Sequence, residues 1–366
     1  MSNQTPLVLI GVGTAGARMA YGVRRAFGEG LRFVVCDTDA HTAQEDDDAF
    51  VLLGGDRLSG LGAGGDVVND QLAARDSITA LDERLTGVRL AIVLTCLGGG
   101  TGGGATVEIA KRLAENGIPS LVFATLPFSF EGEDRRRNAN RVTASLEEAA
   151  SSTFLLPLDT LVGGIDNMEE ALRRATDTLA SGIALFWRLV EKPGYIRLDV
   201  ERLRLIAQQA GRGRFAVATC QGPTRAEEAV DQLLRSELLA TANTPVRAAI
   251  CGVLAGEDLR LAELDTIANG LQQAFGSRIT FDLGTVNDEE TFSGRLSVVV
   301  LLFETPRATS PRDKNTTGRA RARAKADPLA LNAPGLGRFD KTAHAEWHGQ
   351  NLDEPTYLRK GITLEK

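Results

Sequence analysis

Short apolar runs alternate with amphipathic stretches through the first 166 residues of this 366-residue chain. Runs such as PLVLIGV and LAIVLTC have the length of strands, whereas ATVEIAKRLAENG has apolar residues at helical spacing. Strands that alternate with helices form a parallel sheet with helices on both faces. The sequence therefore predicts an α/β fold with a doubly wound parallel sheet over residues 1–166.

The pattern changes in the second half of the chain. Residues 167–192 carry apolar residues at helical spacing and predict one long helix, followed by a loop and a short helix over 193–211. Four strand-like runs and two amphipathic stretches then predict an α+β domain over 212–305. Residues 306–350 are rich in basic and small polar residues, which predicts a disordered linker, and apolar residues return in a terminal peptide over 351–366.

Composition excludes several classes of protein. A formal net charge of −7 offers no basic field for nucleic acid. No apolar run approaches the roughly 18 residues that span a bilayer, and the N-terminus lacks the basic segment of a signal peptide. The four cysteines are scattered, which fits a reducing compartment and argues against a zinc or disulfide framework. His344 and His348 are four residues apart without a supporting ligand cluster, so no protein metal site is predicted.

Three glycine clusters lie where strands are predicted to end. GVGTAG at 11–16 opens a helix and fits a dinucleotide fingerprint, with Asp37 and Asp39 following the next strand. GGGTGGG within 97–104 also opens a helix, and GLGAGGD at 60–66 adds a third glycine loop. Backbone N–H groups at a helix N-terminus bind anions. We therefore predict that these loops bind the phosphates of a nucleotide.

These motifs resemble the signatures of the tubulin and FtsZ superfamily. GGGTGGGA resembles its G-G-G-T-G-[ST]-G signature, and CDTDAH, GLGAG and PFSFEGEDRR resemble further family motifs in the same order. KPG, RLDVERLRL and LDEPTYLRKG correspond to later landmarks of bacterial FtsZ. The resemblance covers essentially the whole chain. It implies a GTP-binding protein that assembles head to tail into filaments and takes part in bacterial cell division.

The resemblance also implies a set of nucleotide-binding residues for GTP or GDP, with Mg²⁺ accompanying the nucleotide. Glu131 and Arg135 correspond to ribose and purine contacts, and Asp177 corresponds to the carboxylate that accepts hydrogen bonds from guanine. Adenine lacks those donors, so GTP would be selected over ATP. The expected binding residues are Gly11, Gly13, Thr14, Gly16, Arg18, Asp37, Asp39, Ala63, Gly64, Gly98, Gly99, Gly100, Thr101, Gly102, Gly103, Glu131, Arg135, Arg173 and Asp177.

Several of these positions depart from the family pattern. Leu158 stands where the family has an asparagine, Arg173 where a phenylalanine packs on guanine, and Arg18 where another asparagine lies. Gly103 replaces the serine or threonine of the signature. We expect these changes to alter the affinity for nucleotide without abolishing binding.

The catalytic loop departs further. In the family, the loop after the long helix contributes two carboxylates to the nucleotide of the next subunit. Asp199 matches the first carboxylate, but the second position holds Arg202, and Glu201 beside it is a substitute that points about 100° away on a helix. The expected catalytic residues are therefore Asp199, Glu201 and Arg202, and a slow GTPase is predicted.

Two alternatives stay open at this point. The first is a structural filament protein that binds GTP without hydrolysing it, which the arginine at position 202 favours. The second is a nicotinamide-dependent oxidoreductase, which would use Gly11, Gly13, Gly16 and Asp37.

The expected partners also follow from the resemblance. They are copies of the chain itself, another FtsZ, and membrane tethers or division regulators that bind the terminal peptide, all in the cytoplasm at the division site. No nucleic acid and no membrane span is expected. The tail residues expected to make contact are Leu352, Pro355, Tyr357 and Leu358.

Overall fold

The computed structural model describes most of the chain up to residue 305. The described residues are 6–28, 30–44, 48–163, 167–192, 194–208, 211–240, 245–276, 278–305, 346–347 and 350–351. Residues 1–307 belong to one compact unit and residues 308–366 to a second, in which β11 (Glu346–Trp347) pairs antiparallel with β12 (Gln350–Asn351). Most of the predicted linker and all of the tail contacts lie outside the described residues, as do His344 and His348.

Ten strands of the first unit form a single sheet in the order β3-β2-β1-β4-β5-β6-β7-β10-β8-β9. The seven strands from β3 to β7 pair in parallel, whereas β10 pairs antiparallel with β7 and β8. The predicted α/β fold with a parallel sheet and a following α+β region is confirmed. The strands are β1 (Leu7–Val12), β2 (Phe33–Asp37), β3 (Phe50–Leu52), β4 (Leu90–Cys96), β5 (Ser120–Leu126), β6 (Ser152–Pro157), β7 (Arg212–Gln221), β8 (Val246–Ala255), β9 (Thr280–Asn287) and β10 (Arg295–Glu304).

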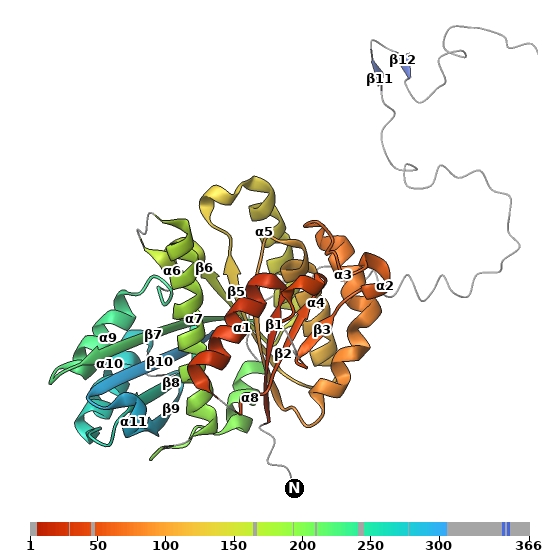
Figure 1. Cartoon of the computed structure of the whole chain (residues 1–366). Coiled ribbons are helices and arrows are strands. Elements are labelled where there is room, and N and C mark those ends of the chain that lie inside the picture. The colour runs from red at the N-terminus through yellow and green to blue at the C-terminus, as the bar shows by residue number, and fades with distance from the viewer. Residues whose placement is uncertain are drawn as a thin grey trace, which may run out of the picture. The chain divides into compact units, whose positions relative to one another are not determined.

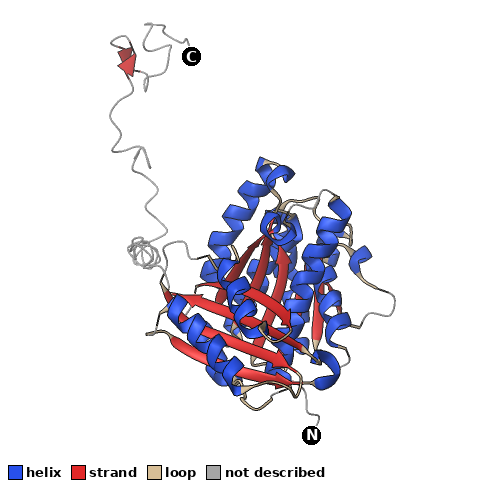
Figure 2. Cartoon of the chain, turned by 90° about the vertical axis from the view of Figure 1, so that its left-hand side faces the viewer, coloured by secondary structure: helices blue, strands red, loops and turns tan. Residues whose placement is uncertain are grey.

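Helices cover both faces of this sheet (Figures 1 and 2). Among the described residues, no helix is long and apolar enough to cross a membrane. The helices are α1 (Gly13–Phe27), α2 (Gly55–Leu58), α3 (Val67–Ser77), α4 (Gly100–Glu115), α5 (Glu133–Ala149), α6 (Leu158–Val162), α7 (Met168–Glu191), α8 (Val200–Gln208), α9 (Arg225–Arg235), α10 (Leu261–Phe275) and α11 (Glu289–Phe292). Short 3₁₀ turns cover Ala40–Thr42, Ile78–Leu85 and Ser129–Glu131.

The central strands are buried on both faces, which explains their continuous apolar runs. Along β1, Leu7 and Leu9 pack into the core beneath α1 and α7, whereas Val8 and Ile10 pack into a second core beneath α4 and α5. Because successive side chains of a strand point to opposite faces, one apolar run supplies both cores.

Helix α7 is the predicted long helix and joins the two halves of the unit. Asn167 caps its N-terminus by accepting a hydrogen bond from the backbone N–H of Glu170 at 3.0 Å. Its buried face packs on α1 near one end and on the C-terminal strands near the other. At that second end Leu189 fills the space where a Cβ of Gly252 would lie, 2.4 Å from the leucine Cδ2.

Strands β6 and β7 connect the parallel part of the sheet to the C-terminal part. They pair at two positions only, one of which joins Phe154 to Gly213. The Phe154 ring is fully buried, stacks on Phe123 with centroids 4.6 Å apart, and meets Phe303 edge to face at 5.8 Å. Phe303 lies on β10 opposite Gly213, so its edge-to-face contact with Phe154 stabilises the connection across this short pairing.

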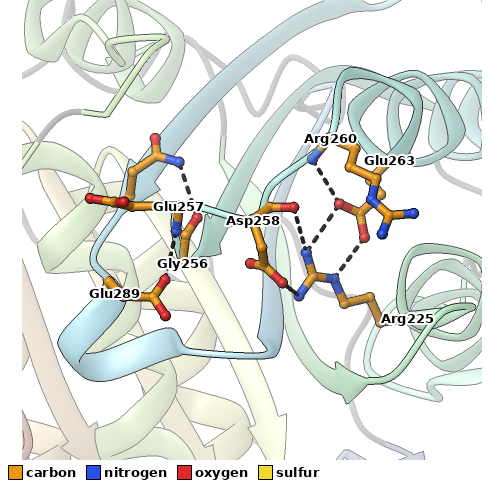
Figure 3. Close-up of polar contacts among 8 residues, drawn as sticks. Arg225, Gly256, Glu257, Asp258, Arg260, Glu263 and Glu289 are labelled. Atoms are coloured by element: carbon orange, nitrogen blue, oxygen red, sulfur yellow. Dashed lines mark hydrogen bonds and ion pairs between the residues drawn. The ribbon is translucent and has the colours of Figure 1, made fainter.

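A buried arginine fixes the loop after β8, as Figure 3 shows. Arg225 is 4% exposed and donates to Glu263 at 2.6 Å and to Asp258 at 2.8 Å. Hydrogen bonds from Arg225 to Glu263 raise the pKa of the guanidinium, so the cation stays charged inside this cluster. The cluster ties α9 to the N-terminus of α10 and leaves the arginine fully engaged.

We predict that Phe154→Ala lowers the free energy of unfolding by about 3–5 kcal/mol, because it removes a buried ring and leaves a cavity. Chemical denaturation followed by circular dichroism would measure this change. Leu261→Ala is the matched control, since Leu261 is 76% exposed and its truncation should change stability by less than about 0.5 kcal/mol. Equal effects of the two substitutions would contradict the role given to Phe154.

Candidate functional site

The order of the strands locates the candidate site. The chain passes from β1 to β2 and β3 on one side, and then crosses to β4 on the other side of β1. In open α/β sheets, a ligand binds at the carboxyl ends of the strands where the order reverses in this way. The glycine cluster at 11–16 begins in the last residues of β1, and the cluster at 97–104 directly follows β4, so both meet at this point.

The first glycine cluster allows the loop after β1 to pack against the loop after β4. Gly13 has a φ of +73°, and a Cβ there would lie 3.0 Å from the backbone nitrogen of Gly102. A Cβ on Gly16 would lie 2.4 Å from the carbonyl oxygen of Leu94 in β4. These glycines are therefore required for contact between two backbones.

The glycines of the second cluster serve two different purposes. Alternate positions have their Cβ space filled by the protein itself. A Cβ on Gly100 would lie 1.9 Å from Oδ2 of Asp70, and one on Gly102 would lie 2.3 Å from the carbonyl oxygen of Cys96. Tight packing therefore already demands glycine at these positions, whether or not the loop binds a phosphate.

Open space borders the backbone at Gly99, the residue before α4, and at Gly64 and Gly65 in the third glycine loop. A Cβ at any of these positions would meet no atom within 4 Å. We call the backbone of Gly64, Gly65 and Gly99 the glycine cradle. Helix α4 begins at Gly100, directly after Gly99, and the N-terminus of a helix offers N–H groups and the positive end of its dipole to an anion.

Asp37, at the end of β2, organises the adjoining loops. The carboxylate is buried and accepts hydrogen bonds from the hydroxyls of Thr14 at 3.1 Å and Thr42 at 2.7 Å, and from the backbone N–H of Thr38 at 2.8 Å. Asp39 accepts from the backbone N–H of His41, and this bond lowers the pKa of Asp39. Both predicted acids therefore hold their own loop in shape beside the first glycine cluster.

Asp70 on α3 is a residue of this site that sequence reasoning missed. Its Oδ1 accepts hydrogen bonds from the hydroxyls of Thr38 at 2.8 Å and Thr101 at 3.0 Å, and these hydroxyls lie 2.7 Å apart. Burial raises the pKa of Asp70, the two hydroxyl bonds oppose that rise, and the charges of Asp37 and Asp66 add to it. The only sequence signal is an acid one turn into the helix that follows the third glycine loop.

A cavity of about 410 Å³ lies beside the first glycine cluster, between α1 and α7. It contains three of the predicted binding residues, Arg18, Arg173 and Asp177. Arg173 Nη1 lies 3.4 Å from Asp177 Oδ2 in an exposed pair. The arrangement combines cations with a carboxylate, which suits a polar planar ligand. The remaining lining residues are Tyr21, Arg25, Gln44, Glu169, Leu172 and Thr176.

Glu131 and Arg135, the predicted ribose and purine contacts, lie near Gly98. Their side chains form an ion pair at 2.5 Å, and Glu131 also accepts from the backbone N–H of Phe128 at 2.8 Å. A Cβ on Gly98 would lie 3.2 Å from the carbonyl oxygen of Arg135. Leu158, where the family has a polar residue, is buried in a small apolar cluster with Phe128.

The predicted catalytic residues Asp199 and Glu201 lie near the amino ends of β1 and β4, whereas the glycine clusters lie at their carboxyl ends. Glu201 pairs with Arg89 at 2.7 Å, and Arg89 directly precedes the first residue of β4. Asp199 and Glu201 share a cavity of about 570 Å³ with Pro6, which precedes β1. The six residues of β1 span about 20 Å. The structure therefore does not bring these residues to the glycine cradle within one copy of the chain.

Two of these three residues form ion pairs within their own copy. Glu201 accepts from Arg89 and, at 3.0 Å, from Arg204, whereas Arg202 pairs with Asp282 at 2.6 Å. Burial acts to raise the pKa of Glu201, but the two arginines outweigh it and hold the pKa below its ordinary value. Asp199 accepts from the backbone N–H of Glu201 at 2.9 Å and is exposed.

Comparison with known proteins agrees with this geometry. The sequence model of the Tubulin/FtsZ family GTPase domain matches residues 6–166, and that of the FtsZ family C-terminal domain matches residues 211–304. The cell division protein FtsZ of Pseudomonas aeruginosa is 30% identical over 293 residues, which cover 78% of this chain and 74% of that protein. The chain belongs to the tubulin/FtsZ family.

A second FtsZ relative matches a larger share of the chain. FtsZ of Azotobacter vinelandii is 28% identical over 359 residues, 96% of this chain and 88% of that protein. The matched model is that of a GTPase domain, which argues against a nicotinamide-dependent oxidoreductase.

Solved structures of family members have the same fold. An empty FtsZ dimer from M. jannaschii superposes with a TM-score of 0.76 at 24% identity, covering 81% of this chain and 87% of that one. CetZ2 from Haloferax volcanii, solved as a GTPγS-bound protofilament, superposes with a TM-score of 0.70 at 24% identity, covering 87% and 99%.

The two kinds of glycine predict effects of different size on stability. Gly99 has a φ of −86° and faces open space, so Gly99→Ala should change the free energy of unfolding by less than about 1 kcal/mol. Gly100→Ala should lower it by about 1–3 kcal/mol, because the new methyl group collides with the Asp70 carboxylate. Urea denaturation of both variants tests the difference. Equal stabilities would contradict the packing role of Gly100.

Proposed function

We propose that this chain is a GTP-binding filament protein of the FtsZ type that assembles head to tail in bacterial cell division, in the cytoplasm at the division site. It hydrolyses GTP slowly where one copy meets the next. The observation that carries this proposal is the position of two half-sites at opposite ends of the same strands. The glycine cradle includes Gly99, which lies just beyond the carboxyl end of β4, and Asp199 shares a cavity with Pro6 and Arg89 at the amino ends of β1 and β4. Repeated head-to-tail contact brings such halves together and generates a filament.

The nucleotide binds with its phosphates on the glycine cradle and its base in the cavity of Arg173 and Asp177. The phosphates accept hydrogen bonds from the N–H groups at the start of α4. Guanine donates to the Asp177 carboxylate, which selects GTP over ATP because adenine would leave that acceptor unpaired. Arg173, which lines the same cavity, can stack its guanidinium plane on the base.

Mg²⁺ bound with the nucleotide would supply positive charge to offset that of the phosphates. In the part of the chain that the structure describes, no group of three acidic, histidine or cysteine side chains could hold such an ion.

Hydrolysis rests on Asp199 of the neighbouring copy, which orients the attacking water. Glu201 cannot readily serve as the second carboxylate, because Arg89 and Arg204 hold it. Arg202 pairs with Asp282 and supplies no carboxylate. One oriented carboxylate in place of two supports slow turnover.

The same ion pairs favour a second candidate function. If the engaged catalytic loop stops hydrolysis altogether, the protein is a structural filament that binds GTP and copolymerises with or stabilises a more active relative. Measured turnover separates the two functions.

The first test is phosphate release from GTP with Mg²⁺, measured against protein concentration beside sedimentation of the same samples. We expect release and pelleted polymer to rise together above a threshold concentration. Asp199→Asn should reduce release about 100-fold while polymer persists, because asparagine keeps the cap on α8 and loses the charge. Polymer that forms equally well without nucleotide would contradict the proposal.

A double substitution tests why turnover is slow. Arg202→Asp alone would set two carboxylates against each other at Asp282, so it is combined with Asp282→Asn. We expect release to rise about tenfold or more in the double variant, and not in Asp282→Asn alone. Wild-type polymer without any release, together with release by the double variant, would support the structural filament instead.

A further inference from the structure

Asp70 is a buried acid with one oxygen that has no partner. The residue is 1% exposed, and among the described residues its Oδ2 has no hydrogen-bond partner. Oδ2 lies against Gly100, 1.9 Å from the place of a Cβ on that residue, and the Cα of Gly65 lies 3.0 Å from the same place. The free oxygen therefore lies where the third glycine loop meets the start of α4, next to the glycine cradle.

The surroundings of Asp70 carry negative charge. Asp37 at the end of β2 and Asp66 at the start of α3 are the acids whose charges act on it, whereas α4 presents a hydroxyl and glycines. Within the described part of the chain, no ion pair involves any of these three carboxylates. A phosphate on the glycine cradle adds further negative charge beside Asp70. Like charges in a buried site disfavour the ionised form of a carboxyl group.

A proton neutralises the Asp70 carboxylate more easily than a metal ion does. Oδ2 is closed off by glycine backbone and has less than 1 Å² of exposed surface. Hydrated Mg²⁺ keeps several waters in a strict octahedron, and no space for such a shell adjoins this oxygen. A proton from solvent needs no such room and removes the charge that would repel the phosphate.

We propose that Asp70 is a positioning residue of the glycine cradle that carries a proton when nucleotide is bound, so that nucleotide binding takes up one proton from solvent. The neutral carboxyl group still accepts the hydroxyl bonds of Thr38 and Thr101, and so holds the loop after β2 to the start of α4. This inference rests on the proposed binding of nucleotide phosphates at the glycine cradle. It adds a link between pH and affinity at that site.

The direction of the pH effect follows from the linkage. Burial already holds the pKa of Asp70 above its ordinary value, and a bound phosphate raises it further. Affinity is independent of pH below the pKa of the free protein, where the acid is already neutral. Between the pKa values of the free and bound states, affinity falls by up to about tenfold per pH unit as the pH rises.

The experiment measures the dissociation constant of GDP by calorimetry from pH 5 to pH 8, in paired buffers of different ionisation enthalpy. Asp70→Asn keeps the shape and the hydroxyl-bond acceptor without a titrating group. The wild type should lose affinity with rising pH more steeply than Asp70→Asn and should take up a proton that the variant does not. Asp76→Asn is the matched control, because Asp76 is an exposed acid on the same helix, paired with Arg57, and should follow the wild type.

The pH dependence of binding and the measured proton uptake together test the role of Asp70. Parallel pH profiles and equal proton uptake in the wild type and Asp70→Asn would overturn the proposal. A greater dependence on Mg²⁺ in the wild type, without proton uptake, would assign the compensating charge to the cation and also overturn it. If Asp70→Asn fails to fold, proton uptake by the wild type alone still tests the proposal. Failure of every protein to bind GDP or GTP would instead refute the proposed function.

Discussion

The parallel pairing of β1 with β4 determines where the glycine-rich turns of the candidate site lie. The two strands pair in register from Leu7 with Leu90 to Val12 with Thr95. Because they run in the same direction, the turns after both strands leave the sheet at the same edge. Contact between those turns then requires glycine, since Gly13 approaches the backbone of Gly102 within the space of one methyl group. The glycine-rich sequence is thus a consequence of strand pairing as much as of ligand binding.

The same pairing separates the two halves of the proposed reaction. The amino ends of β1 and β4 carry Pro6 and Arg89, and Arg89 holds the start of α8 through Glu201. A rigid strand buried on both faces cannot bend to bring its two ends together. A reaction that needs both ends therefore requires two copies of the chain, which ties turnover to assembly.

Much of the fold could be predicted from local pattern. The apolar runs of the central strands and the periodicity of α7 correspond to elements buried in the core, because burial selects apolar residues at a fixed spacing. Strand β3 was not predicted, because its three residues, Phe50–Leu52, are too short for any period to be visible. Helix α3 was not predicted either, because its sequence VVNDQLAARDS mixes apolar and polar residues around the helix.

The candidate site was only partly predictable, for a different reason. Glycine clusters indicate a turn, because the backbone conformation of a turn depends on residues that are adjacent in the sequence. The partners of Asp70 and Glu201 come from distant segments and become visible only when the chain is folded. The sequence therefore indicates which residues could bind or catalyse, and the structure shows which of them already form ion pairs or hydrogen bonds within the chain. Glu201 illustrates the difference. Its place beside position 202 makes it a candidate catalytic carboxylate, whereas in the folded chain it pairs with Arg89.

Charge gives the proposed filament its direction. In the described part of the chain, Asp37 and Asp66 act on Asp70 beside the glycine cradle and form no ion pair, and bound phosphates would add to their negative charge. The opposite edge presents Arg89, Arg197, Arg202 and Arg204 with the acids Asp199, Glu201 and Asp282. Two phosphate sites placed together would set negative charge against negative charge. A phosphate site against an arginine-rich surface is electrostatically complementary, and complementarity of this kind fixes orientation more than affinity. The distribution of charge along the strands therefore supports the proposed head-to-tail polarity, in addition to the two half-sites at opposite ends of the strands.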